Sequence, residues 1–476
     1  MENKTKRNKT SMLKILISMT LVLMLCLGTF LPVFAKDSNM SEGDENSPAT
    51  AAITKILDMP VGTPIPEATF TFEFEPYKVD TNLHDPEAPI GTKGYMPEIT
   101  PKEIEFEIDP SDPTKYKDTK YIDYSTSPTT GVVSAYKESD DFVNLGEGIE
   151  WPHAGVYEYY VTETKNTFEG TDGNDGDYEE TMLYSETKYI VRVYVESKSG
   201  GGTYVEVVTV HQIIKNAQND EIEGLKVDPT PGGDGENYDY SQMIFRNTYY
   251  RETGETDPTD PDSAALVISK TVLGAYSNLE TLYFDFWIKI TNPAVGFNGD
   301  EKYKAYVMEK KVDDANVTYV NVTSDKNGAI TVNGSDTYIE FTSGTTRTVK
   351  LLHNQYLVFQ PLPVGSTFAV EEQAMLNYTP EYYLTSLNNN NKKITGAQSL
   401  PLGFPSTAYS ETNTDKYIGV KNNRADFINR YMNVTPTGIS VDDLPYIAII
   451  GLVLISFATF IMIIVRKNTK RAVNND

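Results

Sequence analysis

Apolar and polar residues alternate with a period of two over most of the chain between residues 48 and 431. Val, Ile, Thr, Tyr and Phe fill the alternating runs, as they do in strands that are buried on one face. Clusters of Gly, Asn, Asp and Pro separate the runs, and almost no stretch has the period of a helix. Clear examples of the runs are residues 69–74, 157–161, 189–195, 282–287 and 348–351. Short strands with turn signals between them predict an all-β fold of the sandwich type.

One polar segment interrupts the alternation. Residues 251–263 contain no aliphatic or aromatic side chain and are rich in Asp, Glu, Thr and Pro. This composition is typical of an extended linker. The segment divides the chain into two predicted tandem Ig-like β-sandwich domains, at 48–250 and 264–431. Residues 36–47 are polar and are expected to form a loose N-terminus.

Charge and cysteine content narrow the classes of function. The chain has 41 Lys and Arg against 67 Asp and Glu, with a net charge of -26. Nucleic acid is therefore not an expected partner, because phosphate binding requires a basic surface. The chain has one Cys, which excludes an internal disulfide and a Cys-rich zinc site.

No metal or cofactor site is expected. The acidic run from Asp172 to Asp177 resembles a calcium loop, but Asp177 stands where an EF-hand loop requires Gly, which favours a solvated turn. The four His residues are scattered, and no nucleophile–base pair or paired carboxylates stand out. We therefore expect a protein that is not an enzyme.

The first 35 residues have the pattern of a secretory signal peptide. Lysines and an arginine form a basic start, an apolar stretch follows, and Val33-Phe34-Ala35 provides a cleavage site. The alternative is an N-terminal membrane anchor. The only Cys, Cys26, lies inside this segment, so we expect a mature chain without cysteine, stabilised by something other than disulfides.

The C-terminus carries a second apolar run. Residues 447–465 lack charge and are long enough to span a bilayer. The basic residues of 466–476 then place the C-terminus inside the cell. Before the span stands the segment 434–438, which reads Val434-Thr435-Pro436-Thr437-Gly438. Together these features resemble the cell-wall sorting signal of Gram-positive surface proteins. That resemblance implies cleavage by a sortase between Thr437 and Gly438, with Thr437 transferred to an amine. The alternative is a single-pass protein with a chance Pro-Thr-Gly.

Polar residues occupy the apolar register of strands at matching places in the two predicted domains. Each domain has a Lys on its first strand, a Glu at the end of a Tyr- or Phe-rich strand, and an Asn on its last strand. The residues are Lys55, Glu163 and Asn247 in the first domain and Lys270, Glu372 and Asn429 in the second. A single lysine of this kind is best explained as a surface residue at a strand end. The repetition of all three, in the same order, favours burial.

Burial of these groups suggests a reaction between them. An apolar pocket lowers the pKa of a lysine and raises that of a glutamic acid. A neutral amine can attack the carbonyl carbon of an Asn side chain while the Glu moves the proton to the departing ammonia. The expected product is a Lys–Asn isopeptide bond from Lys55 to Asn247 and another from Lys270 to Asn429. Glu163 and Glu372 are the expected catalytic residues.

The motifs around these residues resemble streptococcal shaft pilins of the FctA type. They are Ile53-Thr-Lys55, Tyr160-Val-Thr-Glu163, Phe245-Arg-Asn247, Leu266-Val-Ile-Ser-Lys270, Phe368-Ala-Val-Glu-Glu372 and Asp426-Phe-Ile-Asn429. The resemblance covers nearly all of the predicted mature chain. It implies CnaB-type domains with self-made isopeptide bonds, and subunits that a sortase links into a fibre.

One feature departs from that family. Shaft pilins carry a lysine shortly before the bonding Asn of the first domain, and the next subunit is joined to it. Residues 227–245 contain no lysine. We expect Lys226 to be the acceptor, in a loop between Gly224 and Pro229, with Lys215 as the second choice.

The expected function is structural: a backbone pilin of a sortase-polymerised pilus. The resemblance implies a secreted, wall-anchored protein at the cell surface, with its precursor in the plasma membrane. The implied partners are a sortase, neighbouring pilin subunits and peptidoglycan. The alternative is a monomeric wall-anchored adhesin or minor pilin that binds a host surface ligand. A thioester adhesion domain would require a Cys, which the expected mature chain lacks.

Overall fold

The structure is a computed structural model. It describes residues 39–117, 120–122, 131–144, 149–168, 170, 179–232, 240–254, 257–274, 279–297, 299–313, 316–373, 375, 377–386, 389–395, 417–420, 423–431, 456, 459 and 460. The predicted signal peptide at 1–35, the sorting motif at 434–438 and the tail at 466–476 lie outside the described residues, as does most of the predicted span at 447–465. Among the described residues no helix has the length and apolar character needed to cross a membrane.

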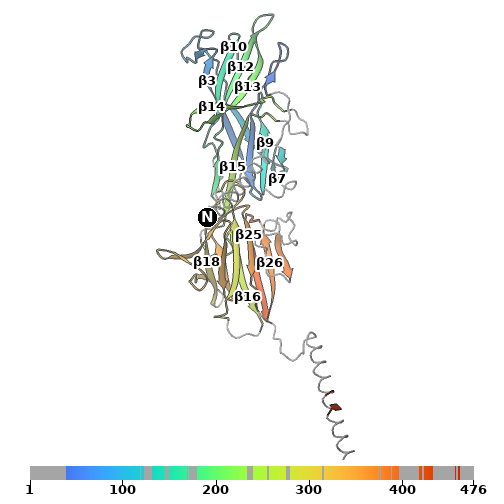
Figure 1. The fold of residues 1–476 in the computed structure, drawn as a ribbon, viewed down its shortest axis with the longest axis vertical. Helices are drawn as coiled ribbons and strands as arrows, with labels where there is room; N and C mark the ends of the chain where they lie inside the picture. Colours follow the sequence, from blue (N-terminus) through green and yellow to red (C-terminus); the bar gives the residue numbers. More distant parts are fainter. Residues whose placement is uncertain are drawn as a thin grey trace, which may run out of the picture.

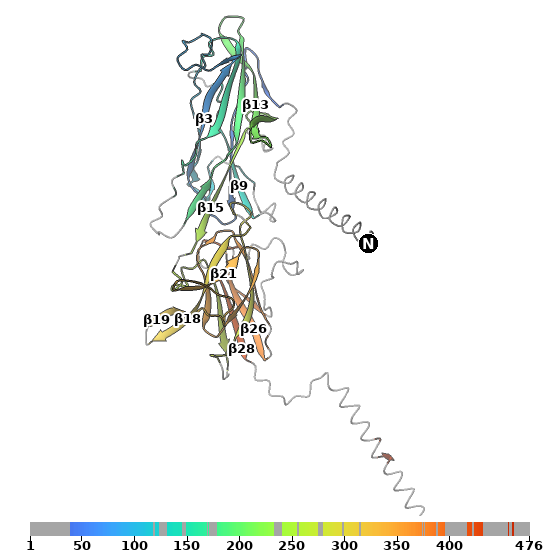
Figure 2. The same ribbon diagram turned by 60° about the vertical axis from the view of Figure 1, so that its left-hand side comes forward.

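β-Strands joined by turns make up almost all of the described chain, and helical residues are confined to Ser456, Thr459 and Phe460. The prediction of an all-β fold is therefore confirmed. Two groups of strands follow one another along the long axis of the molecule (Figures 1 and 2). We call the strands up to residue 253 the N-terminal group and those from residue 266 onward the C-terminal group.

The N-terminal group contains two large sheets. The first sheet has the order β1 (Ser41–Glu42), β13 (Thr203–Lys215), β12 (Lys188–Ser197), β10 (Gly155–Glu163), β3 (Ala68–Val79) and β4 (Asn82–Leu83), with β14 (Glu221–Val227) on β13 and β5 (Lys102–Phe106) on β3. The second has the order β11 (Glu180–Leu183), β15 (Ile244–Thr253), β2 (Thr54–Pro60), β9 (Val132–Glu138) and β8 (Lys120–Ile122). A small hairpin joins β6 (Ile108–Asp109) to β7 (Asp112–Tyr116).

The C-terminal group also pairs a large sheet with a second one. The large sheet has the order β20 (Thr331–Asn333), β21 (Asp336–Thr342), β18 (Lys302–Asp313), β23 (Gln355–Phe359), β16 (Leu266–Leu273), β28 (Arg424–Tyr431), β26 (Tyr378–Ser386) and β27 (Asn389–Thr395), with β19 (Asn316–Asn321) on β18. The second sheet has the order β22 (Thr346–Leu351), β17 (Phe284–Thr291) and β25 (Thr367–Glu372).

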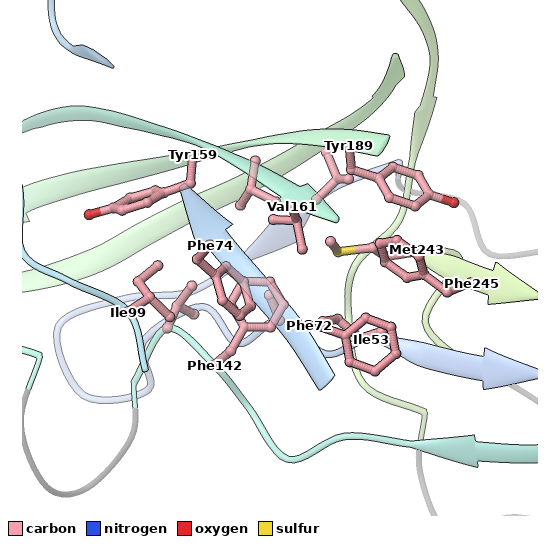
Figure 3. Packing of buried hydrophobic residues seen from close by; sticks show 14 of the residues in the cluster. Ile53, Phe72, Phe74, Ile99, Phe142, Tyr159, Val161, Tyr189, Met243 and Phe245 are labelled. Carbon is pink, nitrogen blue, oxygen red and sulfur yellow. The ribbon is translucent and has the colours of Figure 1, made fainter. Parts of the chain in front are cut away.

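Each group has its own hydrophobic core, formed by the inward faces of its sheets. In the N-terminal group, Phe72 and Phe74 of β3 point between the sheets, with Val161 of β10 nearby (Figure 3). The period-two pattern explains the arrangement, because alternate residues of each strand face the core. On β3, for example, Phe70, Phe72 and Phe74 are buried, whereas Glu73 and Glu75 between and beyond them are exposed.

In each group the strand that bears the Lys and the last strand are parallel neighbours in an otherwise antiparallel sheet. β2 pairs with β15 so that Lys55 lies opposite Phe245 and Leu57 lies opposite Asn247. β16 pairs with β28 so that Lys270 lies opposite Phe427. In both pairs the Asn lies two residues further along than the residue opposite the Lys. Because side chains alternate between faces, this offset puts Lys and Asn on the same face of the sheet.

The N-terminal group is joined to the C-terminal group by a strand and not by the predicted linker alone. β15 continues to Thr253 and pairs with β24 (Leu362–Pro363) of the C-terminal half, with Glu252 opposite Pro363. The backbone N–H of Val364 donates to the carbonyl oxygen of Arg251 at 2.9 Å. The extended linker predicted to start at residue 251 therefore begins with strand residues. Their composition is polar, but their backbone groups find partners on β24.

Two further contacts hold the two groups together near the pairing of β15 with β24, a region that we call the joint. The rings of Tyr250 and Phe297 lie 4.3 Å apart between centroids. Gly365, at a φ of 81°, packs against the N-terminal group so closely that a Cβ atom would stand 2.7 Å from the Cβ of Pro60. Only glycine fits this approach without displacing the backbone around Val61.

Substitution of Gly365 should weaken the joint. Gly344 is a matched control, since its φ is 71° and a Cβ there would meet nothing within 4 Å. Gly344→Ala should cost only the backbone strain, about 1–2 kcal/mol. Gly365→Ala should cost that strain plus about 1–3 kcal/mol for overpacking against Pro60. Urea unfolding of the two variants measures the difference, and equal free energies of unfolding would contradict the packing described here.

Candidate functional site

In the N-terminal group Lys55, Glu163 and Asn247 form one buried cluster, which we call the N-terminal cluster. Lys55 and Asn247 are 0% exposed and Glu163 is 5% exposed. The Lys55 Nζ donates to both carboxylate oxygens of Glu163, at 2.7 Å each. The Asn247 Nδ2 donates to the Glu163 Oε1 at 2.6 Å. One carboxyl group thus contacts the amine and the carboxamide at the same time.

The C-terminal cluster repeats this arrangement with Lys270, Glu372 and Asn429. All three are at most 1% exposed. The Lys270 Nζ donates to the Glu372 Oε1 at 2.5 Å, and the Asn429 Nδ2 donates to the same oxygen at 2.8 Å. The burial that the sequence predicted for these six residues is confirmed, and the structure brings them together as two clusters of three.

Three strands supply each cluster. The Lys and the Asn come from the parallel pair in one sheet, β2 with β15 or β16 with β28. The Glu is the last residue of a strand in the facing sheet, β10 or β25. Each cluster therefore bridges the two sheets across the core.

Phenylalanine rings surround the amines. The Nζ of Lys55 lies 4.3 Å from the ring centroid of Phe70 and 5.8 Å from that of Phe72. The Nζ of Lys270 lies 4.2 Å from Phe284 and 6.0 Å from Phe286 in the same way. These rings exclude water, while their faces attract residual positive charge on the amine.

Burial changes the proton affinity of the amines. It lowers the pKa of Lys55 from 10.5 to about 7, although the Glu163 carboxylate opposes the shift. It likewise lowers the pKa of Lys270 to about 8, against the influence of Glu372. Burial also raises the pKa of Glu372, against the influence of Lys270. Both amines therefore lose their proton at a much lower pH than an ordinary lysine does, which makes the neutral, nucleophilic form accessible.

The predicted acceptor Lys226 does not lie in a loop. It belongs to β14, where it stands opposite His211 of β13, and its side chain is half-buried with the Nζ 3.4 Å from the Sδ of Met40. The turn signals around it were misleading because Gly224 lies inside the strand, near a register shift of the pairing. Lys215 is the exposed last residue of β13.

Two features of the clusters were absent from the sequence prediction. The first is the pair of phenylalanines around each amine, which the repeated Phe-x-Phe of residues 70–72 and 284–286 could have indicated. The second is a hydrogen bond from the backbone N–H of Ser185 to the Asn247 Oδ1 at 2.8 Å. No sequence signal indicates a backbone donor of this kind, because every residue except proline carries one.

The described residues contain no group of three or more His, Cys, Asp and Glu that could hold a metal ion. A family model described as "Domain of unknown function (DUF7601)" matches residues 264–431. No curated protein matches the chain.

Solved structures similar to this chain come from bacterial pili. The crystal structure of the major pilin from Streptococcus pyogenes is 16% identical, with 81% of this chain and 99% of that chain covered and a TM-score of 0.28. The major pilin T3.2 from a Streptococcus pyogenes serotype is 17% identical, with 83% and 99% covered and a TM-score of 0.26. A pilus-presented adhesin is 12% identical, with 80% and 100% covered and a TM-score of 0.20.

The pKa of the Lys55 amine should lie far below that of an ordinary lysine. Asn247→Ala keeps the Lys55–Glu163 pair and removes the carboxamide, so the amine stays free. Its 13Cε resonance should titrate near the value of about 7 in the folded protein and near 10.5 in urea. Between about pH 7 and pH 10.5 Lys55 is protonated in the unfolded chain and neutral in the folded protein. The contribution of this group to the free energy of unfolding therefore increases as the pH rises through this range. A titration at the ordinary lysine value in the folded variant would show that the amine is solvated.

Proposed function

We propose that the protein is the backbone pilin of a sortase-polymerised, cell-wall-anchored pilus, built from two CnaB-type domains with internal Lys–Asn isopeptide bonds. The observation that carries the proposal is the pair of buried Lys–Glu–Asn clusters, each of which connects the strand that bears the Lys, β2 or β16, with the last strand of its group, β15 or β28. In each cluster a lysine of lowered pKa, a carboxyl group and a carboxamide lie within hydrogen-bonding distance.

The proposed reaction joins the Lys Nζ to the Asn Cγ and releases ammonia. Near neutral pH the ammonium of Lys55 passes one proton to Glu163, which leaves a neutral amine. The amine attacks the Asn247 Cγ, and Glu163 delivers a proton to Nδ2 while it takes one from the attacking nitrogen. The C–Nδ2 bond then breaks. The products are the isopeptide bond, one ammonia and Glu163 in its protonated form, so atoms and charge balance. Fixed proximity of the groups supplies much of the lowering of the barrier.

The bonds suit a fibre that carries tension. The Lys–Asn bond of each cluster connects the strand that bears the Lys directly to the last strand of its group, so a pull that would separate these two strands is carried by a covalent bond. A loop closed from Lys55 to Asn247 is stabilised by roughly 5 kcal/mol if the entropy relation for disulfides is applied to it. A mature chain without cysteine has no disulfide to provide such a connection.

The sequence features at the two ends support attachment to the wall. A signal peptide at 1–35, the sorting motif at 434–438, the apolar span at 447–465 and the basic tail at 466–476 together specify secretion, retention in the membrane and transfer by a sortase to peptidoglycan. The sortase and neighbouring subunits are the proposed partners. We propose Lys226 as the amine that receives Thr437 of the next subunit.

One observation favours the alternative of a monomeric wall-anchored adhesin or minor pilin. Lys226 lies in a paired strand with a half-buried side chain, and a strand fits the extended-substrate cleft of an enzyme less well than a loop does. Polymerisation distinguishes the two functions.

The mass of the mature protein tests the bonds. Each bond releases one ammonia, so the folded chain should be lighter than its sequence mass by about 34 Da, or about 17 Da for each cluster. Glu163→Ala and Glu372→Ala should each restore about 17 Da, because proton transfer is lost. Intact-mass spectrometry checks both values. A mass equal to the sequence mass would refute the isopeptide bonds.

Wall extracts test the assembly. Expression with a sortase should yield a ladder of high mass, with branched peptides that join Thr437 to Lys226 in tandem mass spectra. Lys226→Arg should abolish the ladder, and the matched control Lys215→Arg should keep it. A ladder that survives Lys226→Arg would reject this acceptor. Single-subunit wall linkage through Thr437, without any ladder, would support the adhesin or minor pilin instead.

A further inference from the structure

A chain segment crosses from one sheet to the other directly over the N-terminal cluster. β11 pairs with β15 as far as Leu183, which lies opposite Thr248, and β12 starts at Lys188 in the facing sheet. The intervening residues leave the sheet at the level of Asn247. Ser185 lies in this crossing, is 7% exposed, and directs its backbone N–H at the Asn247 Oδ1 at 2.8 Å.

This hydrogen bond fixes the orientation of the carboxamide. A backbone N–H can only donate, so the atom that it meets on Asn247 must be the carbonyl oxygen and not the amide nitrogen. The amide nitrogen therefore points the other way, to the Glu163 Oε1 at 2.6 Å. The carboxamide thus presents its leaving nitrogen to the proton carrier and its oxygen to a buried donor.

We propose that the backbone N–H of Ser185 stabilises the oxyanion that forms on Asn247 during isopeptide bond formation. The inference rests on the proposed function, since it concerns that reaction. When the Lys55 amine attacks Cγ, the C=O electron pair moves to Oδ1, and the negative charge develops on the atom that Ser185 contacts. A fixed donor in a buried site stabilises such a charge far more than it stabilises the neutral carbonyl. The charge returns to the C=O bond as ammonia leaves.

Among the described residues, the C-terminal cluster has no such backbone donor, for a topological reason. β26 stays in the sheet beside β28 along its whole length, and Pro380, which has no N–H, lies opposite Asn429. Within the described part of the chain, Asn429 Oδ1 and Glu372 Oε2 are buried without hydrogen-bond partners. The C-terminal cluster therefore serves as an internal reference in the same molecule.

The test follows both reactions in one refolding experiment. The chain of residues 36–437 is purified unfolded in denaturant, diluted to start folding, quenched in acid at intervals, and analysed by tandem mass spectrometry for each cross-link. Replacement of Ser185 by the corresponding α-hydroxy acid, through nonsense suppression, exchanges only its N–H for an ester oxygen. This change should slow the Lys55–Asn247 reaction by about 10²–10³-fold and leave the Lys270–Asn429 reaction unchanged. Ser185→Ala, which keeps the N–H, should react at the wild-type rate.

A second measurement does not depend on the ester variant. Lys55→Met cannot form the bond and keeps the Asn247 carboxamide, so the Ser185 amide should exchange its hydrogen slowly. Addition of Asn247→Leu should make this exchange at least tenfold faster, as expected for the loss of a hydrogen bond of about 1.4 kcal/mol.

The outcomes separate the two proposals. No cross-link in the wild-type protein would overturn the proposed function. A Lys55–Asn247 cross-link that forms equally fast in the ester variant would overturn the role of Ser185 alone. So would equal exchange of the Ser185 amide with and without Asn247.

Discussion

In each strand group an amine and a carboxyl group are buried together in an apolar core, and the arrangement of the strands around them has to satisfy this pair. Removing two such charges from water costs several kcal/mol for each ion, and only close pairing offsets it. Lys55 and Lys270 meet this cost in the same way, with a carboxyl oxygen within 2.7 Å of each Nζ. Because burial also lowers the pKa of both amines, a proton can pass between the partners and remove the charges. The same proton transfer that makes burial of the pair tolerable also produces the neutral amine that can react.

This pairing dictates the topology around it. The Glu stands on the facing sheet, while the Lys and the Asn stand on neighbouring parallel strands, β2 with β15 and β16 with β28. None of the three can meet until both sheets have formed and the ends of the chain have come together. The chemistry of the cluster must therefore follow folding, and a bond formed there would lock a fold that already exists. The offset of two residues between Lys and Asn appears in both parallel pairs. Because the offset is even, the two side chains lie on the same face of the sheet.

The sequence alone predicted the features that follow from the period-two alternation of apolar and polar residues. The alternation around Lys55, Glu163 and Asn247 predicted that these polar side chains face the core, and the structure places them there. The sequence did not predict the features that depend on strand pairing with distant parts of the chain. Arg251 to Thr253 carry no apolar side chain, yet they extend β15 because β24 offers backbone partners. Lys226 stands near a Gly and a Pro, yet pairing with β13 makes it part of a strand. The hydrogen-bond donor at Ser185 is a backbone N–H, so the amino-acid sequence could not indicate it.

The joint matters for resistance to tension because it lies between the two clusters along the chain. In a bonded protein, tension that reaches Asn247 follows β15 to Thr253 and enters β16 on its way to Lys270 and Asn429. The remaining strands of each group lie outside this path and carry little load. Between the two bonds the load rests on the backbone from β15 to β16, supported by the pairing of β15 with β24 and by the contact of Tyr250 with Phe297. These non-covalent contacts are the weakest part of the path. Extension under force should therefore begin by separating the two strand groups at the joint, while both hydrophobic cores stay intact.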